Sequence, residues 1–185
     1  MISGLLRRFG AQGAAIRTPR LRLIAITPGM LSAETAGKKP LSIATRAQVP
    51  PDWPPVYWEL PVWTHIRAQL EAEPATFGWH RYMLSADRPH RLIGCLGGFP
   101  CTDGDVELGY SVINSLHRQG FGSEAAGALM DWLLHQPQVR SVSAQAFETA
   151  LASVKVMQRC GMQYVGVGEH PGTVRYRRTR RPARS

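Results

Sequence analysis

Two glycines, Gly120 and Gly122, stand in the segment HRQGFGSEAAGALM, immediately before an alanine-rich run with helical periodicity. The first turn of a helix has backbone N–H groups without intrahelical partners, and the helix dipole favours negative charge there. Glycines let an anion approach those N–H groups closely, and Arg118 adds a cation. The segment therefore predicts either a binding site for a phosphate or diphosphate group or only a tight connection into the helix.

A strand of mixed polarity, VELGYSVI, precedes these glycines. One face of this strand takes Val106, Leu108, Tyr110 and Val112, and the other takes Glu107, Gly109 and Ser111. The second face is small and polar, and its glycine permits a bulge that exposes main-chain donors and acceptors. We expect the strand and the helix start to hold different parts of one long ligand.

Four segments, in this order along the chain, resemble the GNAT acetyltransferases, and within them the ribosomal-protein N-terminal acetyltransferases. TPRLRLIAITP is similar to the first strand of that branch, VELGYSVI to its acetyl-CoA strand, HRQGFGSEA to its pyrophosphate loop, and ALASVKVMQRCGMQYVG to its last helix and following strand. The resemblance covers most of the chain. It implies an α/β fold with a GNAT-like mixed, mostly antiparallel central sheet flanked by helices.

The same resemblance implies that acetyl-CoA is the co-substrate and that its pyrophosphate lies in the glycine segment. The residues assigned in this way to acetyl-CoA are Tyr110, Ser111, Val112, His117, Arg118, Gln119, Gly120, Phe121, Gly122, Ser123 and Ser153.

Three positions depart from the pattern of that family. His117 stands where the family has Gln or Arg, although a neutral imidazole still donates one hydrogen bond. Ala150 replaces an Asn that touches the cofactor arm, which removes one contact. Met157 replaces the Tyr that protonates the leaving thiolate in many relatives, whereas Ser153 matches a Ser that this branch carries one turn earlier.

Acetyl transfer from a thioester to an amine requires a neutral amine, a polarised carbonyl and a proton for the departing thiolate. Glu107 is the candidate base, and the alternative is a carboxylate paired with a neighbouring arginine. A main-chain N–H near Tyr110 or Ser111 would hold the carbonyl oxygen. Ser153 is the candidate proton donor, and the alternative is a hydroxyl bonded to a carbonyl of its own helix.

Aromatic side chains crowd a proline-rich stretch that corresponds to the acceptor wall in relatives. The predicted substrate-binding residues are Trp53, Trp58, Trp63 and Trp79. The expected acceptor is an amine-bearing small molecule or the N-terminus of a peptide or protein. The alternative is that these aromatic residues belong to the core.

The elements that position these residues follow from apolar periodicity and turn signals. Strands are expected at 20–26, 79–85, 91–99, 105–113, 139–147, 162–169 and 173–179. Short helices are expected between Pro28 and Pro61, and longer helices at 61–73, at 120–135, and from a cap at Thr149 to a stop at Gly161. We expect a single domain at 16–178, between a flexible basic tail at 1–15 and a basic tail at 179–185.

Composition limits the remaining classes. No apolar run approaches the ~18 residues that span a membrane, and the first 20 residues fit a secretory signal poorly. Cys95, Cys101 and Cys160 are odd in number and lack metal-ligand spacing. This predicts reduced thiols in a cytoplasmic protein, no metal site, and a core role for Cys160.

The net charge of +9 is concentrated at one end of the chain. The segment RYRRTRRPARS holds six of the 22 Lys and Arg residues and none of the 13 Asp and Glu residues, which leaves about +3 on the remainder. Such a segment is either a solvated end or a weak RNA contact.

The sequence therefore predicts an acetyl-CoA-dependent N-acetyltransferase that moves an acetyl group directly to a primary amine. Two alternatives stay open: an acyl-CoA-binding protein that has lost catalysis, because of the three departures, and an RNA- or ribosome-associated module that uses the basic tail. A monomer and a homodimer are both compatible with the sequence.

Overall fold

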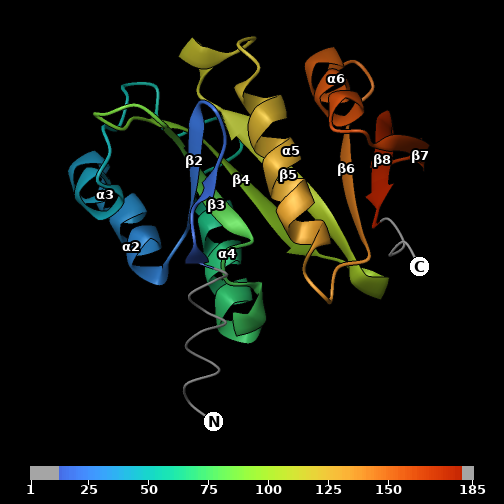
Figure 1. Ribbon diagram of the computed structural model, residues 1–185, viewed down its shortest axis with the longest axis horizontal. Coiled ribbons are helices and arrows are strands. Elements are labelled where there is room, and N and C mark those ends of the chain that lie inside the picture. Colours follow the sequence, from blue (N-terminus) through green and yellow to red (C-terminus); the bar gives the residue numbers. More distant parts are fainter. Residues whose placement is uncertain (1–12, 181–185) are drawn as a thin grey trace. The chain divides into compact units, whose positions relative to one another are not determined.

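The structure is a computed structural model that describes residues 13–180 of the 185-residue chain. Figure 1 shows how its helices and strands are arranged. The strands are β1 (Ile16–Arg17), β2 (Leu21–Ala25), β3 (His80–Ser85), β4 (Leu92–Pro100), β5 (Asp105–Val112), β6 (Ser141–Phe147), β7 (Gln163–Val167) and β8 (Thr173–Thr179). The α-helices are α2 (Pro28–Ala36), α3 (Lys38–Thr45), α4 (Leu60–Ala72), α5 (Phe121–Leu134) and α6 (Leu151–Arg159), and short 3-10 turns are η1 (Pro74–Thr76), η2 (Thr102–Gly104) and η3 (Asn114–Leu116).

Hydrogen bonding orders the strands as β1-β2-β3-β4-β5-β6-β8-β7. β5 and β6 are parallel, whereas β2 pairs with both β1 and β3, and β8 with both β6 and β7, in antiparallel register. A parallel pair needs a crossover connection, which α5 supplies. The predicted mixed, mostly antiparallel α/β fold is confirmed.

The described chain divides into two compact units. The first contains residues 13–96 and 111–121, and the second contains residues 97–110 and 122–180. Some of the segments that resemble the acetyltransferase family therefore belong to the first unit and others to the second. The expected single domain at 16–178 stays a prediction.

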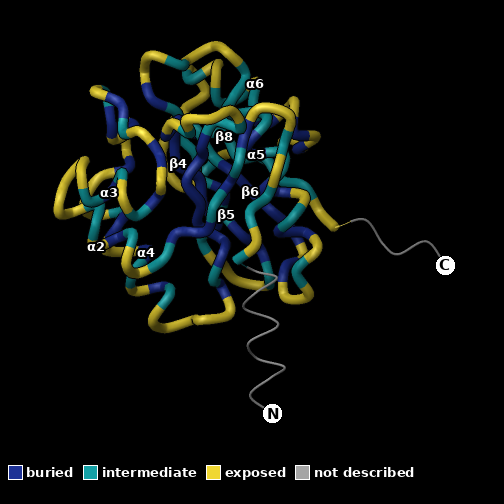
Figure 2. The backbone as a smooth tube through the Cα atoms, turned by 60° about the vertical axis from the view of Figure 1, so that its left-hand side comes forward, coloured by how far each residue is buried: buried dark blue, intermediate teal, exposed yellow. Residues whose placement is uncertain are grey.

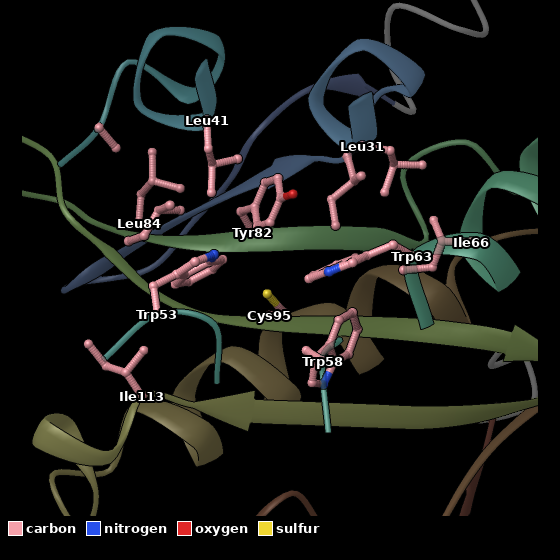
Figure 3. Packing of buried hydrophobic residues seen from close by; sticks show 13 residues of the cluster. Leu31, Leu41, Trp53, Trp58, Trp63, Ile66, Tyr82, Leu84, Cys95 and Ile113 are labelled. Atoms are coloured by element: carbon pink, nitrogen blue, oxygen red, sulfur yellow. The ribbon is translucent and has the colours of Figure 1, made fainter. Parts of the chain in front are cut away.

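The first unit has an aromatic core, shown in Figure 3. Trp53 and Trp63 are 6% and 5% exposed, and their rings lie 5.8 and 6.1 Å from that of Tyr82. Leu31 of α2 and Leu41 of α3 point toward these rings (Figure 3). This core fixes the two short helices against β3 by burial of apolar area.

The second unit is built on α5. The helix buries Ala125, Leu129 and Leu133 completely, at the i, i+4 and i+8 spacing of one helical face. Gly98 of β4 lies so close to this core that a Cβ there would be 2.7 Å from Val106. Figure 2 shows that the exposed residues gather in connecting loops, while strand residues are largely buried or half-buried.

A buried arginine holds the first described residues in place. Arg81 of β3 is fully buried, and its Nη1 donates to the carbonyl oxygens of Ala14, at 2.8 Å, and Leu23, at 3.1 Å. Burial lowers the pKa of Arg81 to about 10. Ala14 falls within the predicted tail at 1–15, of which residues 1–12 lie outside the described chain.

Most expected elements are confirmed within a few residues, including the two short helices before Pro61. The sequence did not predict β1, because two residues are too short to show periodicity. The expected cap of α6 is wrong: its N-cap is Ala150, without a side-chain hydrogen bond, and not Thr149. Gly161 does end that helix, with φ of 72°. Among the described helices, none combines the length and apolar composition required to cross a bilayer.

Candidate functional site

The glycine turn, His117–Gly122, follows η3 and includes the first two residues of α5. Gly120 has φ of 83° and Arg118 has φ of 61°, so the backbone is left-handed at two positions just before α5 begins at Phe121. Gly120 adopts this conformation without steric cost. The side chains of His117, Arg118 and Gln119 are exposed. The turn therefore exposes three polar side chains where α5 begins with N–H groups that lack intrahelical partners.

Arg20 is a second cation at this turn, and the sequence analysis missed it. Its Nη1 donates to the carbonyl oxygen of Gln119 at 2.9 Å, and its guanidinium carbon lies 4.3 Å from the ring centroid of Phe121. No local pattern could have shown this contact, because Arg20 and Gln119 are 99 residues apart. Arg20 and Arg118 give the turn two guanidinium groups, a donor set that fits a diphosphate.

His117 uses one ring nitrogen within the turn. Its Nε2 lies 2.8 Å from the carbonyl oxygen of Val112, an atom that only accepts hydrogen bonds, so Nε2 carries the proton. A neutral imidazole has one N–H group, and here that group is already donated. His117 was expected to donate this N–H to a ligand. In the structure the N–H instead donates to the main-chain oxygen of Val112.

Tyr110 and Ser153 lie together in the second unit. The phenol of Tyr110 on β5 donates to the main-chain oxygen of Ser153 on α6 at 3.2 Å. Burial raises the pKa of Tyr110 above its ordinary value. Ser153 is half-buried, whereas Met157, one turn later, is only 1% exposed. The structure thus joins one predicted acetyl-CoA residue to the predicted proton donor, and their roles stay predictions.

Glu107 is engaged in a polar network away from this pair. One carboxylate oxygen accepts from Gln145 Nε2 at 2.9 Å, and the other accepts from Arg175 Nη2 at 3.0 Å. Arg175 also pairs with Glu169, at 3.1 Å. Glu107 and Tyr110 point to opposite faces of β5 because they are three residues apart. The described contacts therefore do not bring Glu107 and Ser153 together. They do show Glu107 paired with an arginine, which is the alternative to a catalytic base that the sequence left open.

The same strand face carries a second acidic residue that the sequence analysis did not select. Asp105, 8% exposed, accepts from the hydroxyls of Ser141 and Ser143 at 2.5 and 2.6 Å, and it pairs with Arg177 at 3.5 Å. Asp105 and Glu107 thus bind alternate residues of β6 and β8. Period-two alternation could have indicated this shared face.

The four tryptophans predicted to bind substrate are 3–6% exposed. Trp53 and Trp63 line a cavity of about 400 Å³ together with Glu34. Trp58 and Trp79 are not among the residues that line it. Core and pocket are therefore not exclusive alternatives for Trp53 and Trp63, and their role in substrate binding stays a prediction.

The basic C-terminal segment is largely engaged in the fold. Arg175 pairs with Glu107 and Glu169, Arg177 with Asp105, and Arg178 with Asp131 at 2.8 Å. Arg180 donates to the main-chain oxygens of Leu134 and Gln136. Of the six arginines in this segment, only Arg181 and Arg184 lie outside the described residues. The hypothesis of an RNA contact through this segment therefore depends mainly on these two arginines, because the other four bind groups of the fold.

None of the three cysteines, Cys95, Cys101 and Cys160, forms a disulfide in the structure. Cys95 is fully buried, and Cys160 is 8% exposed, with its pKa raised to about 11 by burial. This raised pKa disfavours a thiolate nucleophile at neutral pH. Within residues 13–180, no cluster of His, Cys, Asp and Glu is arranged to hold a metal ion.

Comparison with known proteins gives a consistent result. Residues 43–163 match the family described as an acetyltransferase (GNAT) domain. Over 99 residues the chain is 26% identical to YjdG of Bacillus subtilis (strain 168), which is named an uncharacterized N-acetyltransferase. The match covers 52% of this chain and 59% of YjdG, so the chain spans less than two thirds of the length of that relative.

Two solved structures show the likeness in fold. An acetyltransferase from Agrobacterium tumefaciens str. C58 has a TM-score of 0.61 at 20% identity, covering 89% of this chain and 93% of that one. RimL, named a ribosomal L7/L12 alpha-N-protein acetyltransferase and solved in complex with coenzyme A, has a TM-score of 0.59 at 19% identity, covering 89% and 97%.

Proposed function

Since this chain belongs to the GNAT acetyltransferase family, we propose that it transfers the acetyl group of acetyl-CoA directly to a primary amine. The glycine turn carries the proposal: left-handed backbone at Arg118 and Gly120 leads into the first residue of α5, and Arg20 donates to the carbonyl oxygen of Gln119 in the same turn. A helix N-terminus with nearby guanidinium groups is suited to a diphosphate.

In this proposal, the first-turn N–H groups of α5 and the guanidinium groups of Arg20 and Arg118 hold the pyrophosphate. The main chain of Ser111 and Val112 holds the extended arm, and a main-chain N–H near Tyr110 or Ser111 holds the thioester oxygen. Acetyl-CoA supplies an acyl group activated by a thiolate leaving group.

The proton transfers fall to two side chains. Glu107, which has no described contact with Ser153, takes the proton of the attacking amine through water, and for this it exchanges one of its two present donors, Gln145 or Arg175. Ser153 donates a proton to the departing thiolate. Tyr110 supports Ser153 through the hydrogen bond to its main-chain oxygen.

The acceptor is a primary amine on a small molecule or at the N-terminus of a peptide or protein. The name of RimL supports the second class by likeness in fold. Both classes belong in an acceptor screen.

The glycine turn is tested with a pair of variants that differ in charge. Asn and Asp both tolerate left-handed backbone. A carboxylate at Gly120 would repel a diphosphate, and it would also draw away Arg20, whose Nη2 is 3.4 Å from an ideal Cβ there. We expect Gly120→Asp to bind acetyl-CoA about tenfold more weakly than Gly120→Asn, or about 1.4 kcal/mol, in calorimetric titration.

Equal affinity of the two variants would contradict the assignment of the pyrophosphate to this turn. Acetyl-CoA binding without turnover of any amine would favour the alternative, an acyl-CoA-binding protein that has lost catalysis. Absence of binding by the unmodified chain would leave the RNA-associated module as the remaining hypothesis.

A further inference from the structure

A cavity in the first unit has a chemistry that acetyl-CoA binding does not explain. It has a volume of about 400 Å³, in the range of small-ligand pockets. Glu34 of α2, Leu41 of α3, Trp53, and Trp63 of α4 line it. Figure 3 shows Trp53, Trp63 and Leu41 gathered with Tyr82 around Cys95. An apolar, aromatic cavity thus carries a carboxylate in its wall.

The Glu34 carboxylate has neutral partners. Oε1 accepts from Trp53 Nε1 and Oε2 accepts from the Tyr82 hydroxyl, both at 2.7 Å. None of the ion pairs within the described residues includes Glu34. An ionised carboxylate has about four lone-pair sites, so two acceptor directions are unused. Burial raises the pKa of Glu34, against the effect of these two hydrogen bonds, as is expected where no cation compensates the charge.

The other charged residues at the cavity do not neutralise Glu34. Lys38 lines the cavity, but its Nζ donates to the carbonyl oxygens of Pro50, at 3.2 Å, and Pro51, at 2.7 Å. Glu59, at the start of α4, is an exposed second carboxylate among the lining residues. The cavity therefore has two carboxylates and one ammonium group that is already bound, which favours a cationic ligand.

The geometry selects among cations. A guanidinium group that binds through both oxygens at once would need the one remaining acceptor direction of each Glu34 oxygen, because each already accepts a hydrogen bond from the protein. A single ammonium group needs only one free acceptor direction, and indole faces stabilise cations further. The apolar walls formed by Leu41, Trp53 and Trp63 suit an unbranched alkyl chain.

We propose that Glu34, Trp53 and Trp63 form a binding site for a primary alkylammonium group. The inference rests on the proposed function in one respect, that the amine bound here is part of an acetyl acceptor. Binding itself is independent of acetyl-CoA. The site narrows the acceptor to a molecule with a primary ammonium group on a flexible apolar chain.

The test uses a matched pair of small probes on the full chain. Calorimetry follows titration with n-butylammonium and with n-butanol, and tryptophan fluorescence, to which Trp53 and Trp63 contribute together with the other three tryptophans, is recorded alongside. We expect butylammonium to bind about tenfold or more tightly than butanol, because the charge-assisted hydrogen bond is absent from the alcohol. Equal binding of the two probes would overturn the proposal without use of any variant.

A variant pair then locates the charge. In Glu34→Gln, the amide oxygen can still accept from Trp53 and the amide N–H can donate to the hydroxyl oxygen of Tyr82, so the shape of the wall and both contacts are kept while the charge is removed and the Tyr82 O–H loses its acceptor. Glu71→Gln makes the same change at an exposed position of α4 outside the cavity. We expect about a tenfold loss of butylammonium affinity in the first variant and none in the second. An equal effect in both, with thermal unfolding unchanged, would overturn the proposal.

Separate measurements distinguish this inference from the proposed function. Acetyl-CoA-dependent turnover of amines, with butylammonium binding indifferent to Glu34→Gln, would reject the ammonium site and leave the acetyltransferase in place. Butylammonium binding that depends on Glu34, without acetyl-CoA turnover, would support the site and reject the proposed function.

Discussion

At the scale of single residues, Glu107 shows what a local pattern can and cannot provide. Strand alternation placed it on the polar face of β5, and the structure confirms polar partners there. The sequence left open whether a nearby arginine pairs with it. That arginine is Arg175, 68 residues later, where it binds Glu169 as well. Because Arg175 binds both Glu107 and Glu169, substitution of each carboxylate in turn distinguishes a catalytic role of Glu107 from a role that consists only of pairing with Arg175.

We expect Glu107→Gln to lower kcat about a hundredfold, because it removes the candidate base. Glu169→Gln breaks the other pair of the same Arg175 and should change kcat by about twofold or less, since exposed ion pairs contribute little. Steady-state kinetics of both variants, with thermal unfolding measured alongside, checks this. A parallel loss in the two variants would mean that Glu107 acts only by positioning Arg175.

At the scale of elements, α6 begins without a side-chain cap. The prediction of Thr149 as cap relied on residue type, but the helix begins one residue later, at Leu151, after Ala150. Ends of helices depend on where the following turn packs, which the sequence does not show within one or two residues. The buried face at the C-terminal end of this helix was predictable, because Met157 and the C-cap residue Cys160 follow the apolar periodicity and are buried.

Ala150→Asn should add the missing cap and raise the free energy of unfolding by about 0.5–1 kcal/mol. The same change restores the residue type that the family resemblance places beside the acetyl-CoA arm. We therefore expect acetyl-CoA affinity to rise as well. Urea unfolding and calorimetry measure the two effects independently. Ala150→Leu, which has no capping group, is the control, and an equal gain in that variant would contradict the cap.

At the scale of the whole molecule, the fold class and the order of helices and strands along the chain were accessible because amphipathic periods and a family-like motif order extend over most of the chain, whereas the order of the strands within the sheet was not predicted. Burial was less accessible. Trp53 and Trp58 have the same residue type, so the sequence cannot distinguish their positions. Only the tertiary structure shows that both are buried and that Trp53 lines the cavity, whereas Trp58 is not among its lining residues. The contact of Arg20 with Gln119 likewise depends on distant segments. The basic segment illustrates the same limit, because its charge composition suggested a solvated tail.

The stability of the whole chain should depend on pH through His80. This residue is 1% exposed, and its ring Nε2 lies 2.9 Å from Gln69 Oε1. Burial lowers its pKa to about 3, whereas the unfolded chain titrates at about 6.5. Between these values the unfolded state binds the extra proton, so stability is lost as pH falls. From pH 7 to about 5 we expect a loss of about 2 kcal/mol in the free energy of unfolding.

Urea unfolding at several pH values measures this loss. His80→Gln removes the titrating group and should flatten the dependence, while His135→Gln, at an exposed position of the same residue type, should retain it. Parallel pH curves for the unmodified chain and His80→Gln would contradict the assignment.

The anchoring of Ala14 by Arg81 has a practical consequence for expression vectors. A purification tag with a protease site inserted between residues 14 and 17 would, after cleavage, remove the carbonyl oxygen of Ala14 and leave the buried guanidinium of Arg81 without that acceptor. A cleavage site placed before residue 13 retains the acceptor. Fusion partners for this chain are therefore best joined ahead of that position, where the strand pairing of Ile16 with Leu23 is also preserved.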